Sequence, residues 1–284
     1  MLGALTLVPW FALGAAGARW ANPDRMPPSA AAQSTASGLR LASQAGILGA
    51  IHPLAAMLSI IMPTLNEAAT IVAALRQLQA LRHGGAEVIV VDGGSGDATV
   101  ELARSWADRV ETAPRGRAAQ MHAGATVARG DTLLFLHADT ALPAAADALI
   151  ATALAGGAAW GRFDVRIDGS HSMLPIVAWS MNGRSRLTGI ATGDQAMFVR
   201  RDAYDEVGGF PDIALMEDIA LSRALLRLGR PACLRARVVT SGRRWQQRGV
   251  VRTMLLMWRL RLAYFFGADP GDLAVRYGYG RPRR

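Results

Sequence analysis

Polar side chains follow apolar runs at three places in this chain. Asn66 and Glu67 come after LSIIMPTL, Asp92 comes after EVIVV, and His137 and Asp139 come after LLFL. Short apolar runs that stop at a polar group are typical of buried strands. In an open α/β sheet, ligands bind at the carboxyl ends of the strands, so these side chains are candidates for a binding site.

His137 and Asp139 are the candidates for a metal site. Residues i and i+2 of an extended chain leave it on the same side, so the imidazole and the carboxylate can converge on one ion. A hard cation such as Mg²⁺ or Mn²⁺ would take the carboxylate oxygen together with the oxygens of a nucleotide diphosphate. The alternative is structural, with Asp139 capping the next turn and His137 packed in the core.

Asp92 stands before Gly93, Gly94 and Ser95 in the segment DGGS. Glycines allow a tight turn and expose backbone amides to a ligand. The spacing differs from the GxGxxG pattern of dinucleotide-binding proteins, so that class is not indicated. The alternative is that Asp92 serves only as a turn residue or a helix cap.

Arginines supply two candidate anion sites. Arg115 and Arg117 flank Gly116 at the start of a predicted helix, where guanidinium groups and backbone amides together would hold a phosphate. Arg244 and Trp245 would hold a phosphate or a sugar ring. The alternatives are a solvated basic loop for the first pair and surface charge beside a packed indole for the second.

Glu217 and Asp218 begin a predicted helix late in the chain. A carboxylate in that position can take the proton of an acceptor hydroxyl, which is general-base catalysis. The alternative is that both residues only offset the positive end of the helix dipole.

The elements that position these residues alternate between strand and helix. We predict strands at 58–62, 87–91, 109–112 and 132–136, and helices at 68–81, 97–106 and 117–128. The strands are continuously apolar, which is typical of a parallel sheet buried on both faces. The predicted fold class is therefore α/β, with a mostly parallel central sheet and helices on both faces.

The pattern changes after residue 157. Residues 160–167 alternate, which predicts a strand with one exposed face, and helices are predicted at 174–186 and 216–229. Between these helices, residues 192–210 contain a predicted turn, a strand and a short helix.

Charge and cysteine content narrow the classes of partner. The formal net charge is +9, all 31 basic residues are Arg, and the pI is near 11.1. This charge favours anionic partners such as nucleotides, phosphates and acidic lipids. The chain has no basic block with interleaved aromatic residues, so nucleic acid is not indicated. Cys233 is the single cysteine, which excludes a disulfide framework and fits a cytoplasmic protein.

Composition divides the chain into three segments. Residues 1–56 are rich in Ala, Ser, Pro and Gly, and we predict a disordered leader or a mis-assigned start with Met57 as the true start. A signal or membrane anchor is the alternative, because residues 1–17 are apolar. Residues 57–240 are the predicted main domain, and residues 241–284 are a predicted basic amphipathic helical tail.

The tail has two interpretations. Residues 250–266 are apolar but contain Arg252, Arg259 and Arg261, which argue against a membrane-spanning helix. The helix either packs on the main domain as part of its core or lies on an anionic membrane surface. In the second case the protein would be peripheral on the inner face of the membrane, and a lipid-linked acceptor would be favoured.

The order of these motifs resembles the inverting family 2 glycosyltransferases, which have a GT-A fold. The resemblance runs from residue 58 to about residue 277 and is carried by SIIMPTLNEAATI, VIVVDGGSGDAT, RGRAAQMHAGATVARGDTLLFLHADT, GDQAMFVRRDAYDEVGGFPD, MEDIALSRAL and GRRW. Within the family, the chain looks like the radical-SAM/selenodomain-associated transferase 2 branch, also called arsenosugar-biosynthesis glycosyltransferase. These names record genomic association and do not identify a substrate.

The resemblance implies a role for each candidate residue. Asp218 would be the general base with Glu217 beside it, and Asp139 would be the metal-binding Asp of the DxD motif. The donor nucleotide and the acceptor would contact a larger set, namely Pro63, Asn66, Glu67, Asp92, Gly94, Ser95, Arg115, Arg117, Gly193, Asp194, Gln195, Arg244 and Trp245. Within this set, Asp92 would bind the base or ribose, the arginines flanking Gly116 would approach the diphosphate, and residues 193–195 would form the acceptor-side loop.

Two positions depart from the family motifs. His137 stands where the DxD motif has its first Asp, so the single carboxylate of Asp139 would bridge a Mn²⁺ or Mg²⁺ ion and the diphosphate. Ser241 stands where the QxxRW motif of processive members has Gln, which argues against processive polymer synthesis.

The implied reaction moves a sugar from a nucleotide-diphosphate sugar to an unidentified small-molecule or lipid acceptor, with inversion at the anomeric carbon. Two alternatives share parts of the same pattern. One is a nucleotidyltransferase acting on a sugar phosphate, and the other is a non-catalytic protein that binds a nucleotide sugar.

Overall fold

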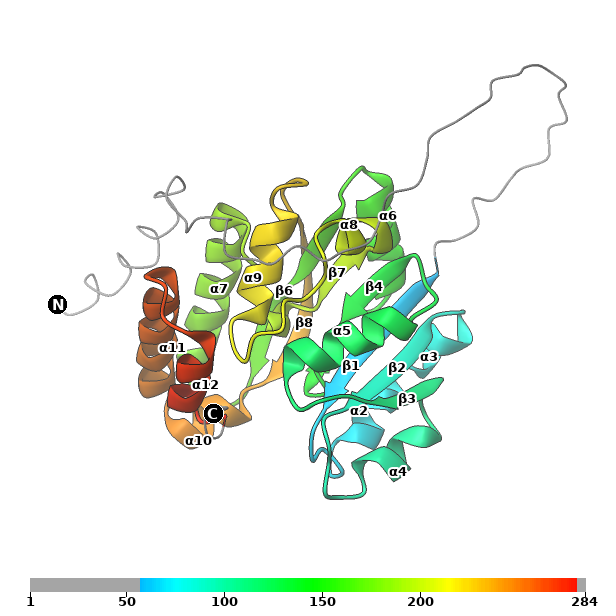
Figure 1. Cartoon of the computed structure of the whole chain (residues 1–284), viewed down its shortest axis with the longest axis horizontal. Coiled ribbons are helices and arrows are strands. Elements are labelled where there is room, and N and C mark those ends of the chain that lie inside the picture. The colour runs from blue at the N-terminus through cyan, green and yellow to red at the C-terminus, as the bar shows by residue number, and fades with distance from the viewer. Residues whose placement is uncertain (1–56, 280–284) are drawn as a thin grey trace, which may run out of the picture.

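The computed structural model describes residues 57–279, so the predicted leader at 1–56 lies outside the described residues. Within this range the chain forms one eight-stranded sheet with helices on both faces (Figure 1). The strands are β1 (Leu58–Thr64), β2 (Glu87–Asp92), β3 (Arg109–Thr112), β4 (Thr132–Phe135), β5 (Thr140–Ala141), β6 (Trp160–Asp168), β7 (Met197–Arg200) and β8 (Ala232–Ser241).

The helices are α2 (Ile71–Gln77), α3 (Gln79–His83), α4 (Thr99–Arg104), α5 (Arg117–Val127), α6 (Ala146–Ala155), α7 (Leu174–Thr188), α8 (Arg201–Glu206), α9 (Glu217–Leu225), α10 (Arg243–Arg248), α11 (Val250–Phe265) and α12 (Pro270–Tyr277). A short 3₁₀ turn, η2 (Gly193–Gln195), lies between α7 and β7.

The strand order of the sheet is β3-β2-β1-β4-β7-β6-β8-β5. Strands β1 to β4 run parallel, β7 runs antiparallel to both β4 and β6, and β8 runs parallel to β6. The predicted α/β class with a mostly parallel sheet is therefore confirmed. The carboxyl ends of β1, β2 and β4 meet at one edge, which brings Thr64, Asp92 and His137 to the same side of the molecule.

The predicted helix at 68–81 is two helices in the structure, α2 and α3, with a break at Leu78. The side-chain amide of Gln79 donates to the Leu75 carbonyl at 2.9 Å, so it uses the acceptor that a continuous helix would give to the Gln79 backbone. The same amide also donates to the carbonyl of Trp106 at 2.9 Å, which ties this break to the end of α4.

Strand β6 matches the prediction of a strand with one exposed face only at its end, where Arg166 and Asp168 are exposed. Residues 160–165 are all buried, because β6 lies inside the sheet between β7 and β8. The polar positions Arg162 and Asp164 do not face solvent but form a buried ion pair with each other. The pattern also gave no prediction of β5, β8 or α6.

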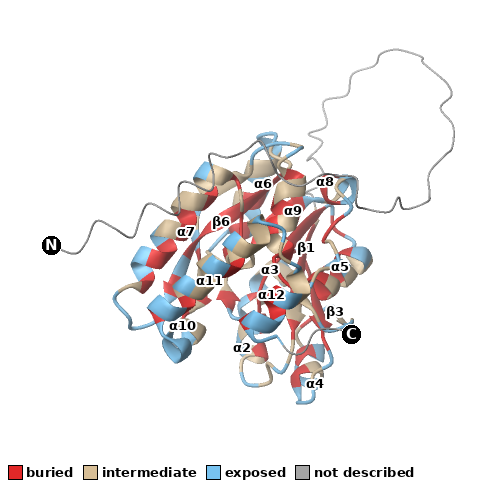
Figure 2. Ribbon diagram, turned by 60° about the vertical axis from the view of Figure 1, so that its left-hand side comes forward, coloured by how far each residue is buried: buried red, intermediate tan, exposed pale blue. Residues whose placement is uncertain are grey.

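The core has two layers, one on each face of the sheet. On β1, Ile60 and Met62 belong to one apolar cluster and Ile61 to the other, as the alternation of side chains along a strand requires. Figure 2 shows the buried residues concentrated on the strands and on the inner faces of the helices. Continuously apolar strands are thus buried from both sides.

The tail helices pack on the rest of the fold. Leu260 of α11 and Leu273 and Tyr277 of α12 form a third apolar cluster with Leu215 and Ile219, which flank the start of α9. The tail therefore contributes to a core, as one of its two interpretations requires. Within residues 57–279, no helix is both long enough and apolar enough to span a membrane.

Helix α5 approaches the sheet closely at Gly124. A Cβ atom at this position would lie 2.4 Å from Ile61 Cγ2 and 3.0 Å from Val91 Cγ2, and both of those side chains are fully buried. This close approach positions the N-terminus of α5 against the carboxyl ends of β1 and β2.

Replacing Gly124 by Ala should lower the free energy of unfolding by about 1–3 kcal/mol, because the added methyl group overpacks the core. The matched control is Gly183→Ala in α7, where a Cβ atom would meet no neighbouring atom within 4 Å outside its own helix. There, the gain in helix propensity should raise the free energy of unfolding by about 0.5–1 kcal/mol. Urea unfolding measures both, and shifts of the same sign would contradict the close packing of α5.

Candidate active site

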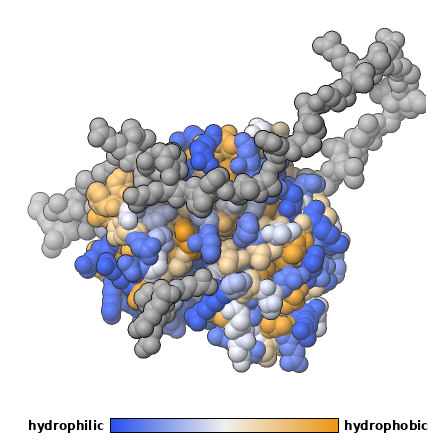
Figure 3. Space-filling model, viewed as in Figure 1, coloured by the Kyte–Doolittle hydropathy of each residue, from blue (hydrophilic) through white to orange (hydrophobic). Residues whose placement is uncertain are grey.

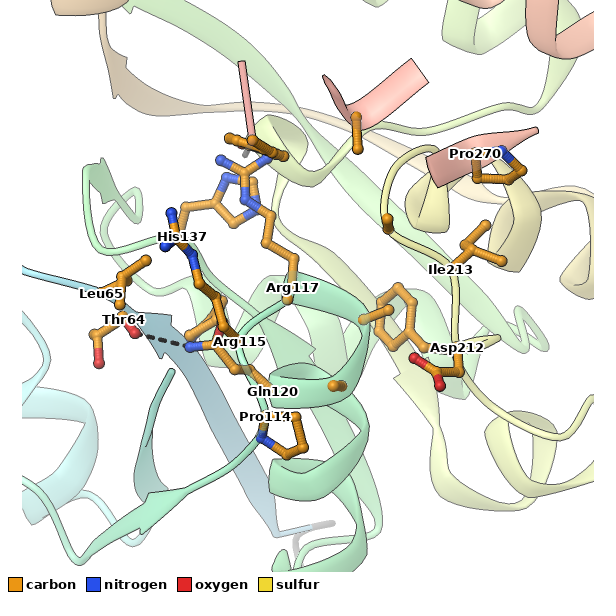
Figure 4. Close-up of a pocket in the computed structure, with 18 of the residues that line it drawn as sticks. Thr64, Leu65, Pro114, Arg115, Arg117, Gln120, His137, Asp212, Ile213 and Pro270 are labelled. Atoms are coloured by element: carbon orange, nitrogen blue, oxygen red, sulfur yellow. Dashed lines mark hydrogen bonds between the residues drawn. The ribbon is translucent and has the colours of Figure 1, made fainter. Parts of the chain in front are cut away.

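A cavity of about 1190 Å³ opens at the carboxyl ends of β1 and β4 (Figure 4). Its walls come from these strand ends, the N-terminus of α5, the loop before α9, and α10 and α12. The lining includes Pro63, Glu67, Arg115, Arg117, Gln120, His137, Asp139, Asp212, Arg243, Arg244, Arg248, Asp269 and Tyr279. Figure 4 shows Arg115, Arg117 and His137 on one side of the cavity and Asp212 and Ile213 on the other.

The N-terminus of α5 gives the cavity a cationic wall. The Arg117 guanidinium lies over the ring of Tyr279, 5.8 Å from the ring centroid. Burial opposes its charge, but the neighbouring Tyr279, Glu217 and Asp194 raise the pKa of Arg117 above its ordinary value. Arg115, two residues before Arg117 in the chain, is exposed and lines the same cavity. Two guanidiniums and the free amides of a helix N-terminus therefore face one space.

Gln120 was not among the predicted site residues. Its amide nitrogen donates to the carbonyls of Thr64 and Val91, each at 2.8 Å, and therefore joins the ends of β1 and β2 (Figure 4). The signal for it is weak, because Gln120 is distinguished only by its position three residues after Arg117, on the same face of the predicted helix.

The Asp92 carboxylate is used within its own turn. One oxygen accepts hydrogen bonds from the amides of Gly94 and Ser95 at 2.9 and 2.7 Å, and the other accepts from the Ser95 hydroxyl. The Ser95 hydroxyl in turn accepts from the Asn66 amide at 2.8 Å. These four residues hold the β1 and β2 ends together and do not line the cavity, so their contact with a nucleotide stays a prediction.

Pro63 and Glu67, by contrast, line the cavity directly. The Glu67 carboxylate accepts from the Thr70 hydroxyl at 2.7 Å and lies 3.9 Å from the Arg243 guanidinium. The loop after β1 thereby contacts the first residue of α10, which closes one end of the cavity.

His137 pairs with the loop that contains η2. Its Nδ1 lies 3.3 Å from Asp194 Oδ1, and the Cε1–Nε2 edge of its ring packs against Gly193. Burial raises the pKa of Asp194, but the hydrogen bond from His137 and the charges of His137, Arg117 and Arg244 outweigh it and lower that pKa to about 2. Among residues 57–279, the buried Nε2 of His137 has no hydrogen-bond partner, and the role of His137 as a metal ligand stays a prediction.

Asp139 is exposed at the edge of the cavity. Within residues 57–279, its carboxylate accepts one hydrogen bond, from the Thr140 hydroxyl at 3.2 Å. No group of three or more His, Cys, Asp or Glu in that range could hold a metal ion by itself. One free carboxylate nevertheless fits the way proteins bind Mg²⁺, which takes one or two carboxylates together with substrate phosphates and water. The residues therefore fit a cation that arrives with a diphosphate.

A second pocket of about 100 Å³ adjoins the cavity and shares Arg117, His137 and Arg244 with it. Its walls are largely apolar and come from α7, the start of α9, α11 and the 3₁₀ turn η2, and they include Val177, Met181, Leu215, Met216, Ile219, Trp245, Met254, Met257, Trp258 and Tyr277. Glu217, Asp218 and Asp194 bring the carboxylates to this pocket. The site thus consists of a wide polar cavity and a narrow apolar pocket that meet.

Asp218 is oriented by the backbone. Its Oδ2 accepts from the Gly193 amide at 3.0 Å and its Oδ1 from the Ile219 amide at 2.7 Å. Met216, at the N-cap of α9, has a φ of 70°, a left-handed conformation that is uncommon for a residue with a side chain. This turn directs the first residues of α9 to the pocket, and strain of this kind is typical of functional sites.

A buried polar network holds the loop that orients Asp218. Gln195 is fully buried, and its side-chain oxygen accepts from the Thr192 amide at 3.2 Å. Its side-chain nitrogen lies 3.4 Å from the Asn182 oxygen, which also accepts from the Val165 amide at 2.9 Å. Gln195 therefore supports the loop from inside and does not line either pocket, so its contact with an acceptor stays a prediction.

Arg162 is the charged centre of this network. Its guanidinium donates to the Ser185 hydroxyl at 3.0 Å, to the Asn182 carbonyl at 3.2 Å and to the Asp164 carboxylate. Asp164 also accepts from Arg186 at 2.8 Å. Every group is paired, as a charge with no solvent exposure requires.

The predicted pair Arg244 and Trp245 lies where the cavity and the pocket meet. Arg244 lines both, and Trp245 lines only the small pocket. The Arg244 guanidinium donates to the Tyr277 hydroxyl and lies 5.3 Å from the centroid of that ring. Arg248 donates to the Tyr277 carbonyl at 3.1 Å, so α10 and α12 hold each other in place at the site.

Burial raises the pKa of Glu217 from an ordinary value of 4.5 to about 7, and the neighbouring Asp218 carboxylate adds to this rise. The folded protein therefore keeps a proton that the unfolded chain releases between these two pH values. Its stability falls as the pH rises from about 4.5 to about 7 and stays reduced above that range.

Glu217→Gln should consequently raise the free energy of unfolding at pH 8 and change it little at pH 4.5, because the amide removes the cost of burying a carboxylate. Urea unfolding at both pH values measures this difference, and Glu101→Gln on the exposed face of α4 is the matched control. Equal effects of Glu217→Gln at the two pH values would contradict the raised pKa.

Two solved glycosyltransferase structures are similar in shape to this chain. A mannosyltransferase from Pyrobaculum calidifontis, in complex with GDP-Man and Mn²⁺, aligns with 80% of this chain and 70% of its own chain at a TM-score of 0.54 and 21% identity. Glucosyl-3-phosphoglycerate synthase from Mycobacterium tuberculosis, in complex with Mn²⁺, UDP and glucosyl-3-phosphoglycerate, covers 76% and 82% of the two chains at a TM-score of 0.52 and 20% identity. At these identities the likeness establishes the fold, which is of the GT-A type.

Curated relatives match a shorter part of the chain. PGL/p-HBAD biosynthesis glycosyltransferases of Mycobacterium bovis and Mycobacterium tuberculosis are 38% identical in an alignment of 95 residues that covers 31% of this chain. The match spans 37% of the length of these relatives.

The family model of glycosyl transferase family 2 matches residues 59–208, which is more than half of the 284-residue chain. This segment begins at β1 and extends through α8, so it contains the carboxyl ends of β1, β2 and β4 and the 3₁₀ turn η2. The predicted membership is confirmed at this level, and the chain belongs to glycosyl transferase family 2.

Proposed function

We propose that the protein transfers a sugar from a nucleotide-diphosphate sugar to a hydroxyl group of an acceptor, with inversion at the anomeric carbon. The observation that carries this proposal is the junction of the two pockets. A wide cavity with arginines at a helix N-terminus meets a narrow pocket that contains an oriented carboxylate pair. A donor and an acceptor can therefore occupy separate spaces and react at their boundary.

The donor side is the large cavity. Arg115 and Arg117 bind the diphosphate together with the amides of the α5 N-terminus, and Pro63 and Glu67 contact the nucleoside. Asp139 holds a divalent cation, Mn²⁺ or Mg²⁺, which when bound offsets the charge of the leaving diphosphate. Both solved relatives described above contain Mn²⁺ and a nucleotide or nucleotide sugar, which supports this assignment.

The acceptor side is the small pocket. The oxygen of the acceptor hydroxyl bonds to the anomeric carbon while Asp218 takes the proton of that hydroxyl. The bond between the anomeric carbon and the diphosphate breaks on the opposite face. The Gly193 amide keeps this carboxylate in place, and the adjacent Glu217 remains largely protonated at acidic pH because it is buried. A positioned base contributes about 10²–10⁴-fold to a rate.

We further propose that the protein is a member of the radical-SAM/selenodomain-associated transferase 2 branch and that it does not synthesise a polymer processively. Both rest on sequence motifs, including Ser241 in place of the motif Gln. The acceptor is a small molecule or a lipid that carries a free hydroxyl.

Asp139→Ala should abolish metal-dependent donor binding. UDP, GDP, CDP and TDP sugars are tested by thermal shift with and without Mn²⁺, and one nucleotide class should raise the melting temperature of the wild type only when the metal is present. The exposed Asp147 in α6 supplies the control, Asp147→Ala, which should keep the shift. A shift with a nucleoside triphosphate and none with any diphosphosugar would favour a nucleotidyltransferase instead.

Asp218→Asn should keep donor binding and lower the rate of transfer by about 10²–10⁴-fold, since the amide still accepts from Gly193 but takes no proton. The rate is measured as release of nucleoside diphosphate from the nucleotide sugar that raised the melting temperature, in the presence of a panel of acceptors that carry hydroxyl groups. Asp205→Asn, at an exposed position on α8, is the matched control. Turnover at the wild-type rate in Asp218→Asn would exclude it as the base, and donor binding without turnover in the wild type would indicate a binding protein.

A further inference from the structure

Helix α7 presents a row of apolar side chains to solvent. Ile176, Trp179 and Leu187 are all exposed, and Trp179 keeps 62% of its surface accessible. Their spacing of three and eight residues places them along one side of the helix, with the small residues Ser180 and Gly183 between them. The opposite side of α7 packs into the core through Leu174, Val177 and Met181, among others.

Helix α11 carries a similar row. Val251, Leu255, Leu262 and Phe266, the last just beyond its end, are exposed, and Phe266 keeps 77% of its surface accessible. Figure 3 shows hydrophobic side chains gathered at the left-hand end of the molecule, where Figure 1 places the end of α11. Exposed Arg252 and Arg259 lie beside this row on the same helix.

The two helices lie next to each other. Residues of both line the small pocket, and Figure 2 shows exposed residues along α7 and α11 on the side that is turned toward the viewer. We name the seven exposed apolar residues of the two rows the α7–α11 face; they are Ile176, Trp179, Leu187, Val251, Leu255, Leu262 and Phe266. Exposed apolar residues gathered in this way mark interaction sites on folded proteins.

Charge narrows the choice of partner. Among the charged residues of α7 and α11, only Arg252 and Arg259 are exposed, and neither helix contains Asp or Glu. A surface with apolar side chains, exposed Trp and Phe, and only positive charges is complementary to an anionic bilayer, whose headgroups attract arginines while the aromatic rings enter the interface. A protein partner or a second copy of this chain would have to place its own acidic residues against these helices.

We propose that the α7–α11 face docks on the surface of an anionic membrane. Trp179 and Phe266 enter the boundary between headgroups and acyl chains, and Arg252 and Arg259 contact the headgroup phosphates. The two helices lie flat on the bilayer and do not cross it.

Docking in this orientation has a consequence for the site, which rests on the proposed function. The small pocket lies between the two helices, because Val177 and Met181 of α7 and Met254, Met257 and Trp258 of α11 form part of its wall. The pocket that contains Asp218 is therefore directly beneath the docked face. An acceptor with an apolar body and a hydroxyl near the headgroup level fits this arrangement.

Flotation with vesicles tests the docking independently of any activity. The full chain is mixed with vesicles of phosphatidylcholine alone or of phosphatidylcholine and phosphatidylglycerol. Wild-type protein should float with the anionic vesicles only, and Trp179→Ser/Phe266→Ser should bind about tenfold less, because it loses two interfacial aromatic anchors. Arg252→Gln/Arg259→Gln should lose the part of the binding that 1 M salt removes, since salt shortens the Debye length to about 3 Å.

Leu102→Ser is the matched control, because Leu102 is an exposed apolar residue on α4, at the other end of the sheet. It should float as the wild type does. The Trp179→Ser/Phe266→Ser variant should keep the donor-induced thermal shift of the wild type, which shows that it is folded.

Three results would overturn the proposal. Wild-type protein that does not float with anionic vesicles has no such surface. Equal flotation of wild type and Trp179→Ser/Phe266→Ser places the membrane contact elsewhere in the chain. A wild-type dimer in sedimentation velocity that the same double variant converts to a monomer assigns the face to a second copy. If no nucleotide sugar raises the melting temperature but the protein still floats with anionic vesicles, the proposed function is rejected and the membrane docking is retained.

Discussion

The candidate site depends on a charge buried in the middle of the sheet. Arg162 has no solvent exposure, and a guanidinium in that position is stable only when its donors are paired. One partner is the backbone carbonyl of Asn182, so Arg162 holds Asn182 in place. The side chain of Asn182 bonds to Val165 of β6 and contacts Gln195. Gln195 in turn orders the 3₁₀ turn η2 whose Gly193 amide orients Asp218. A network that lines neither pocket therefore positions the carboxylate that faces one of them.

The tail is a structural part of the site. Arg117, His137 and Arg244 lie at the boundary of the two pockets, and each is held by a contact to a distant segment. Arg117 lies over Tyr279, His137 pairs with Asp194, and Arg244 donates to Tyr277. Helices α10 and α12 line both pockets and α11 lines the small one, so the segment 241–284, predicted as a tail, contributes to the site.

The large cavity and helix α11 differ in whether they carry acidic residues as well as arginines. In the large cavity, arginines occur together with Glu67, Asp139, Asp212 and Asp269, and the net potential depends on which of these are paired. On α11 the exposed charged residues are Arg252 and Arg259, and this helix contains no Asp or Glu. Positive potential of this kind extends beyond the surface and attracts anions before contact, whether they are nucleotides or lipid headgroups.

Local sequence patterns by themselves determined the parallel half of the sheet and the places where polar side chains follow its strands, because apolar runs and turn residues act over a few neighbouring positions. They also identified Asp139, Arg117 and Asp218, each of which lines a pocket. Only the tertiary structure decided which groups those side chains meet. The alternation of Arg162 and Asp164 has the same local pattern whether the polar residues face water or each other, and their burial follows from β6 lying between β7 and β8. In the same way, His137 pairs with Asp194, 57 residues away, because partners are selected by proximity in the folded chain, which spacing in the sequence does not encode.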